Sequence, residues 1–77
     1  MVRIPVDFNT MNTNPDEKVV IYTKAHFKED EKWIRELKAG RRVILYDGEM
    51  EVEAILEGEP GAQIWYGIPD WSTRKDL

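Results

Sequence analysis

The sequence contains no cysteine and only one histidine, His26. Without thiols, neither disulfides nor a thiolate zinc site can support a small core, so ordinary packing must hold the domain. One histidine without a cysteine also argues against a catalytic triad, because a nucleophile needs a base beside it. We therefore expect no metal, no cofactor and a surface or capping role for His26. The missing disulfides favour a reducing compartment, the cytoplasm.

Long apolar segments are also absent. No stretch approaches the roughly 18 consecutive apolar residues of a membrane-spanning helix. Residues 1–7 have neither the apolar segment nor the small-residue cleavage site of a signal peptide. The five glycines are dispersed, whereas a phosphate-binding loop needs them clustered before a helix. We expect no membrane partner and no phosphate cradle.

Basic residues are outnumbered, with eleven Lys and Arg against fifteen Asp and Glu, for a net charge of -4. Cationic side chains provide most of the affinity of a protein for a phosphate backbone. The charge balance therefore disfavours nucleic acid as a partner.

The apolar content is sufficient for one core. Of the 77 residues, 42% are hydrophobic and 10% aromatic, which is too rich for a disordered chain. A chain of this length buries roughly 60% of its unfolded surface, which supports one core at most. We expect a single domain spanning residues 1–77.

The first half of the sequence predicts two strands. Residues 2–8 alternate between apolar and polar side chains, as in a strand with one buried face. Pro5 has no N–H for a ladder, so this strand belongs at an edge of the sheet. Residues 9–16 are rich in turn formers and predict a loop, and residues 18–24 predict the second strand.

Residues 29–39 change to a helical period. Trp33, Ile34 and Leu37 lie on one stripe, which is expected to pack on the sheet. Gly40 stands where a left-handed residue would close the helix.

Residues 41–57 predict a β-hairpin, because Asp47-Gly48 is a preferred pair for a two-residue loop. With that loop, the facing pairs are Leu45 with Met50, Val43 with Val52, and Arg42 with Glu53. The apolar pairs then share one face and the charged pair lies on the other, which is a stabilising cross-strand pattern.

Residues 58–61 predict a second turn, with Pro60 and Gly61 at the central positions of type II. A strand over residues 63–68 follows. Pro69 is expected to stop it, which leaves residues 69–77 as an ordered turn and a frayed end.

The register of this last strand depends on the length of the loop before it. A four-residue loop sets Trp65 over Ala54. A five-residue loop turns Trp65 outward, near Ile44 and Ile55, and we favour it because it adds two isoleucines to the core. Its facing pairs are Ile64 with Leu56, Tyr66 with Ala54, and Ile68 with Val52.

The order of these elements predicts a mainly β (α+β) fold, with five antiparallel strands and one short helix. The sheet is either strongly bent or closed into a small barrel. Gly40-x-x-Val43, leading into a tight hairpin, resembles small SH3-like barrels. The resemblance implies a fold and no function.

Aromatic residues gather in residues 64–71, and such residues serve both cores and binding hot spots. We predict a non-catalytic protein-interaction or regulatory module that meets another protein or a second copy of itself. The expected binding residues are Trp65, Trp71, Tyr46 and Asp70. An outward Trp65 would form part of an exposed apolar patch.

Two alternatives remain open. Aromatics on a β-sheet also suit a small barrel that binds single-stranded nucleic acid. A small hydrolase or lyase could use Asp70 or a glutamate as its acid at a subunit interface, which requires a carboxyl with a raised pKa. The alternating Glu49, Glu51 and Glu53 indicate a solvated strand face instead.

Overall fold

The computed structural model describes residues 1–8, 18–23 and 28–77. The predicted loop over residues 9–16 and His26 lie outside the described residues. The elements in chain order are β1 (Arg3–Pro5), β2 (Val19–Tyr22), α1 (Lys28–Ile34), β3 (Arg42–Tyr46), β4 (Met50–Glu57) and β5 (Ile64–Asp76).

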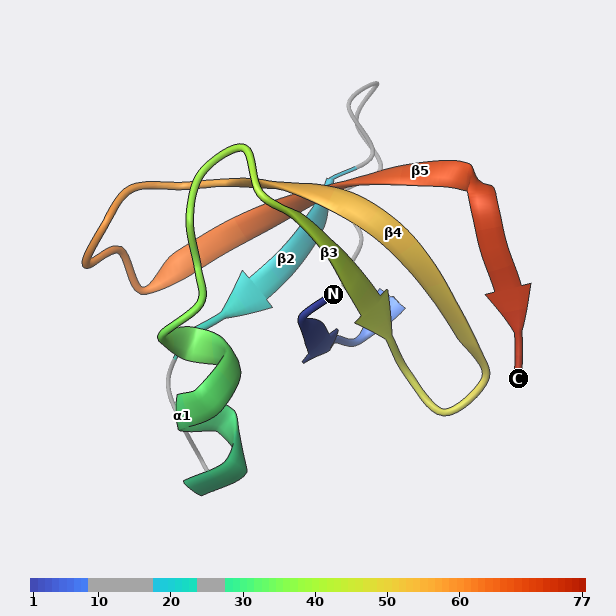
Figure 1. Ribbon diagram of the computed structural model, residues 1–77, viewed down its shortest axis with the longest axis horizontal. Coiled ribbons are helices and arrows are strands. Elements are labelled where there is room, and N and C mark those ends of the chain that lie inside the picture. The colour runs from blue at the N-terminus through green and yellow to red at the C-terminus, as the bar shows by residue number, and fades with distance from the viewer. Residues whose placement is uncertain (9–17, 24–27) are drawn as a thin grey trace.

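The strands form one sheet in the order β1-β3-β4-β5-β2, which curls into a half-barrel (Figure 1). The mainly β fold with five strands and one short helix is therefore confirmed. The pairs β3–β4, β4–β5 and β2–β5 are antiparallel, as predicted. The β1–β3 pair is parallel instead, which its long connection through β2 and α1 allows. No helix in the described ranges is long and apolar enough to cross a membrane.

The edge position predicted for the first strand is confirmed, since β1 and β2 are the two outermost strands. Ile4 is fully buried, while its neighbours Arg3 and Pro5 are exposed, as the alternation predicts. Pro5 lies opposite Tyr46, and β1 has no second neighbour among the described strands that would need an N–H from it.

The core lies on the inner, concave face of the sheet. α1 adds Trp33, which is 9% exposed, and Ile34 and Leu37 pack against the same cluster. The predicted helical stripe therefore does pack on the sheet. The buried sheet residues are Ile4, Val19, Ile21, Val43, Leu45, Val52, Ala54, Leu56 and Trp65.

The helix is shorter than predicted. After Ile34 the chain continues in turns, where the amides of Glu36 and Leu37 donate to carbonyls three residues earlier. Gly40 has a positive φ of 83°, but its N–H donates to the carbonyl of Leu56 at 2.8 Å. The prediction that Gly40 closes the helix is wrong, because the helix ends at Ile34 and the Gly40 amide is already hydrogen bonded to β4.

The hairpin is confirmed, but its predicted register is wrong by two residues. Val43 faces Ala54 rather than Val52. The side chain of Asp47 accepts hydrogen bonds from the amides of Glu49 and Met50, and its own amide donates to the Met50 carbonyl. The two loop residues are therefore Gly48 and Glu49, and the prediction that Asp47 and Gly48 form the loop is wrong, because the Asp47 side chain binds the turn amides from the strand end.

The second turn is confirmed. The amide of Ala62 donates to the carbonyl of Glu59 at 3.0 Å, and Gly61 between them has a φ of 84°. A positive φ at the third of four residues defines type II, and glycine adopts it without strain.

The favoured register of β5 is wrong by three residues, since Ala54 faces Pro69 instead of Tyr66. An odd shift exchanges the two faces of a strand. Trp65 therefore points inward and is only 3% exposed, while Ile64 and Ile68 point outward.

β5 also continues through Pro69 to Asp76, so the predicted strand stop and frayed end are wrong. β2 pairs with β5 only as far as Gly67, so Pro69 lies where β5 has only β4 beside it among the described strands. There a residue without an N–H is tolerated. The ladder shifts between Glu51 and Glu53, and Figure 1 shows β5 bending near its C-terminal end.

Candidate binding surface

The outer, convex face of the sheet carries a group of apolar side chains. Tyr22, Ile64 and Ile68 are 59%, 43% and 39% exposed, and three neighbours are partly buried. We call the group the outer apolar strip. It consists of Val20, Tyr22, Ile55, Ile64, Tyr66 and Ile68.

The strand register makes this strip continuous. Tyr22 faces Ile64 and Val20 faces Tyr66 across the β2–β5 ladder. Ile68 faces Ile55 across the β5–β4 ladder. Directly facing side chains on one sheet face are close enough to contact each other, so the strip crosses three strands.

Ion pairs border the strip. At one side, the Lys18 ammonium lies 2.8 Å from the carboxylate of Glu57. At the other, Arg42 binds Glu53 at 2.7 Å and Asp70 at 3.0 Å. The predicted Arg42–Glu53 pair thus forms, although the two residues are diagonal neighbours in the observed register.

Asp70 is held in its ionised form. The Ser72 hydroxyl donates to its carboxylate at 2.6 Å, and Arg42 donates to the other oxygen. These hydrogen bonds, that of Ser72 first, lower the pKa of Asp70. Glu53 and then Asp70 raise the pKa of Arg42. A general acid needs the opposite shift, so Asp70 has the chemistry of an ion-pair partner.

The four predicted binding residues are divided between the two faces. Trp65 is in the core, and Trp71 packs against the core and against Phe8, with ring centroids 6.5 Å apart. Tyr46 and Asp70 lie on the outer face, where the guanidinium of Arg3 sits 4.9 Å from the centre of the Tyr46 ring.

The expected apolar patch near Ile55 exists, but Ile68 and Tyr66 occupy it in place of Trp65. The sequence reasoning missed these residues because it assigned the wrong face to β5. The available signal was the pair of glycines at positions 58 and 67. A Cβ at Gly58 would collide with the Trp65 ring, and one at Gly67 would lie 2.6 Å from Leu45 Cδ1. Gly58 thus leaves space for the inward ring of Trp65, and Gly67 leaves space for Leu45.

No three His, Asp or Glu residues in the described segments gather closely enough to hold a metal ion. Comparisons with protein-family models, with curated proteins and with solved structures found no match to this chain.

Proposed function

We propose that this chain is a non-catalytic protein-binding module that uses the outer apolar strip. The observation that carries the proposal is the exposure of Tyr22, Ile64 and Ile68 on one continuous face of the sheet. Single exposed apolar residues are ordinary on protein surfaces, whereas contiguous apolar patches mark interaction sites.

The border of the strip suits a protein partner. Protein interfaces combine an apolar centre with a polar rim, and rim charges set orientation and association rate. The Lys18–Glu57 pair and the Arg42 cluster supply both signs of charge around the apolar centre. Asp70 of the predicted set keeps a role in this rim through its ion pair with Arg42, whereas Tyr46 lies apart from it, beside Arg3.

The same border disfavours a single-stranded nucleic acid. Tyr22 and Tyr66 offer rings on which bases could stack, as in other sheet-based binders. Lys18 and Arg42 beside them are already neutralised by carboxylates, and the whole chain carries a charge of -4. We place the module in the cytoplasm, which agrees with a sequence without cysteine.

The test compares the parent chain with a Tyr22→Ser/Ile68→Ser double variant. Both side chains are exposed, so we expect the melting temperature to change little. The matched control is Leu77→Ser, which removes a 64% exposed apolar side chain away from the strip. Sedimentation over a range of concentrations measures self-association, and immobilised chain measures capture of partners from a lysate of the source organism.

We expect the double variant to lose self-association or the captured protein, while Leu77→Ser retains it. Interface hot spots cost about 2 kcal/mol or more on truncation, which is a loss of roughly 30-fold in affinity. The proposal fails if the parent neither self-associates nor captures a partner. Equal behaviour of the double variant and Leu77→Ser would also refute it.

A further inference from the structure

A second feature lies away from the strip, in a cleft of about 590 Å³ between α1, β1 and β3. Among the described residues, three cationic side chains line it, Arg3, Lys32 and Arg41, and two carboxylates face them, Glu36 in the lining and Glu51 paired with Arg3, which leaves an excess of one positive charge. The local charge is thus opposite in sign to the net charge of the chain, which is -4. No residue of the outer apolar strip lines this cleft.

Two contacts hold the Arg3 side chain in place and leave some of its N–H donors unused. Its Nη1 donates to Glu51 at 2.8 Å, and its guanidinium lies over the ring of Tyr46. A guanidinium carries five N–H donors in a fixed fork, so one hydrogen bond leaves the others for a ligand. The two contacts reduce the entropy lost when Arg3 binds an anion.

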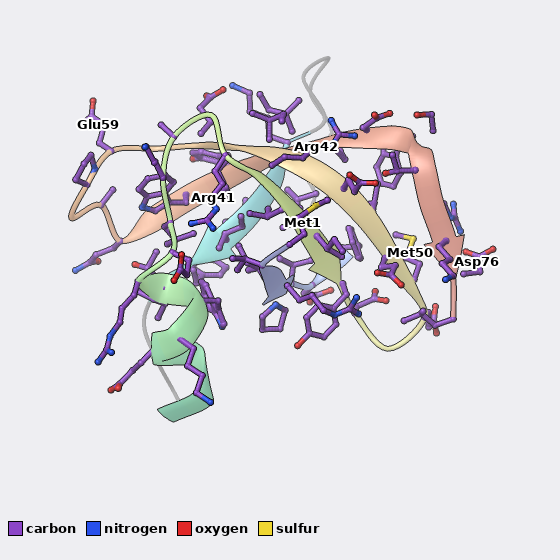
Figure 2. The ribbon with its side chains drawn as sticks, in the orientation of Figure 1. Met1, Arg41, Arg42, Met50, Glu59 and Asp76 are labelled. Carbon is purple, nitrogen blue, oxygen red and sulfur yellow. The ribbon has the colours of Figure 1, made fainter. Side chains whose placement is uncertain are left out.

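Arg41 is fixed in a similar way from the other side of the cleft. Its Nη1 donates to the carboxylate of Glu36 at 2.7 Å and to the Glu36 carbonyl at 3.1 Å. Lys32 is exposed and forms no ion pair with the described part of the chain, so the cleft keeps one uncompensated cation, which the paired Lys18 and Arg42 at the border of the strip do not supply. Arg41 and Met1, which both line the cleft, are labelled below β4 in the view of Figure 2.

We propose that this cleft binds a small organic anion, with a carboxylate or phosphate group attached to a planar apolar body. Guanidinium forks match the paired oxygens of both groups, and an ammonium adds a point charge. The half-buried Tyr46 ring supplies aromatic surface for the apolar body, to which Trp33, only 9% exposed, adds a small part. The volume is within the range of ligand pockets for small molecules, and the cleft is widely open to solvent, so a bound ligand would keep part of its surface exposed.

The experiment is an NMR titration that follows the Trp33 indole N–H and the amides of β1. The probes are phenyl phosphate, benzoate and, as the neutral control, benzyl alcohol. We expect saturable shifts with at least one anion and none with benzyl alcohol. The tighter of the two anions identifies the group that the cleft prefers.

Two variants test the cations. Lys32→Gln removes a charge that no described ion pair needs, so it should leave the fold intact. Arg3→Gln removes the group stacked on Tyr46. We expect each to weaken anion binding at least about tenfold. The control is Arg74→Gln, whose partner Asp76 is at the far end of the sheet in Figure 2.

The site is supported if either anion binds and if Lys32→Gln and Arg3→Gln weaken that binding while Arg74→Gln does not. The inference is overturned if neither anion saturates at millimolar concentration, if benzyl alcohol binds as well, or if Arg74→Gln weakens binding equally. The Tyr22→Ser/Ile68→Ser variant should bind the anion normally, so this test and that of the outer apolar strip are independent.

Discussion

The ring of Trp65 lies against the backbone of Gly58, where a single added carbon would collide with it. The atoms that this carbon would meet belong to the indole itself, which is 3% exposed and enclosed by the core. Neither partner can move away easily, because closely packed interiors transmit strain. Gly58 is therefore required for the inward position of Trp65.

Replacing Gly58 with Ala should destabilise the fold by about 1 to 3 kcal/mol, the usual cost of overpacking a core. Urea denaturation measures the change. Gly48→Ala is the control, because a Cβ there meets nothing within 4 Å and Gly48 is not among the glycines with positive φ. Its free energy of unfolding should change by less than about 0.5 kcal/mol. If the two variants unfold at the same urea concentration, Trp65 does not occupy this position.

Trp65→Ala should act as a core truncation. Removal of a buried Trp or Phe costs about 3 to 5 kcal/mol, a large part of the stability of a small domain. We expect a melting temperature lower by many degrees, or an unfolded chain. Trp71→Ala, at a half-buried position, should cost less. A stable Trp65→Ala variant with a melting curve like that of the parent would contradict this assignment.

The two register errors show what patterning can and cannot determine. In the hairpin, Val43 faces Ala54 and was predicted to face Val52, a shift of two (54 − 52) that keeps every side chain on its predicted face. Val43, Leu45 and Val52 are accordingly all buried. Because side chains alternate with a period of two, a register error of an even number of residues leaves the same side chains on the core face.

β5 shows the opposite case. Ala54 faces Pro69 and was predicted to face Tyr66, a shift of three (69 − 66) that exchanges the faces. Ile64, Trp65, Tyr66 and Ile68 are all apolar or aromatic, so hydropathy alone does not select one face. Steric fit decides instead, through Gly58 and the Trp65 ring. The apolar patch was thus predictable from hydropathy, whereas its members depended on the steric fit that Gly58 and Gly67 allow.

Asp70 should make stability depend on pH. The pKa of Asp70 in the folded chain is lowered from the ordinary value of an aspartate, chiefly by the hydrogen bond from Ser72 and then by that from Arg42. A lowered pKa gives a stabilising contribution that is present above about pH 4 and is lost as the pH falls through the folded value. We expect Asp70→Asn to melt below the parent at pH 7, with a difference that shrinks below pH 4. A difference that persists unchanged at pH 2 would rule out the charged pair as its cause.

The hydroxyl of Thr73 forms hydrogen bonds at the point where the register of the β4–β5 ladder shifts, between Glu51 and Glu53. It accepts a hydrogen bond from the amide of Glu53 at 2.8 Å and donates to the carbonyl of Asp70 at 2.7 Å. Thr73→Val keeps the shape of the side chain but removes both bonds, and it leaves a part-buried N–H without its partner. Such a loss costs about 1 to 3 kcal/mol.

Thr73→Ser is the matched control, because it keeps the hydroxyl and removes only a methyl group. Urea denaturation should place Thr73→Val well below the parent and Thr73→Ser close to it. Hydrogen exchange adds a local measurement, since the Glu53 amide should lose protection in Thr73→Val alone. If the Glu53 amide exchanges at the parent rate in Thr73→Val, the hydroxyl does not hold this part of the ladder, and the bend in β5 must be stabilised by its remaining pairing with β4.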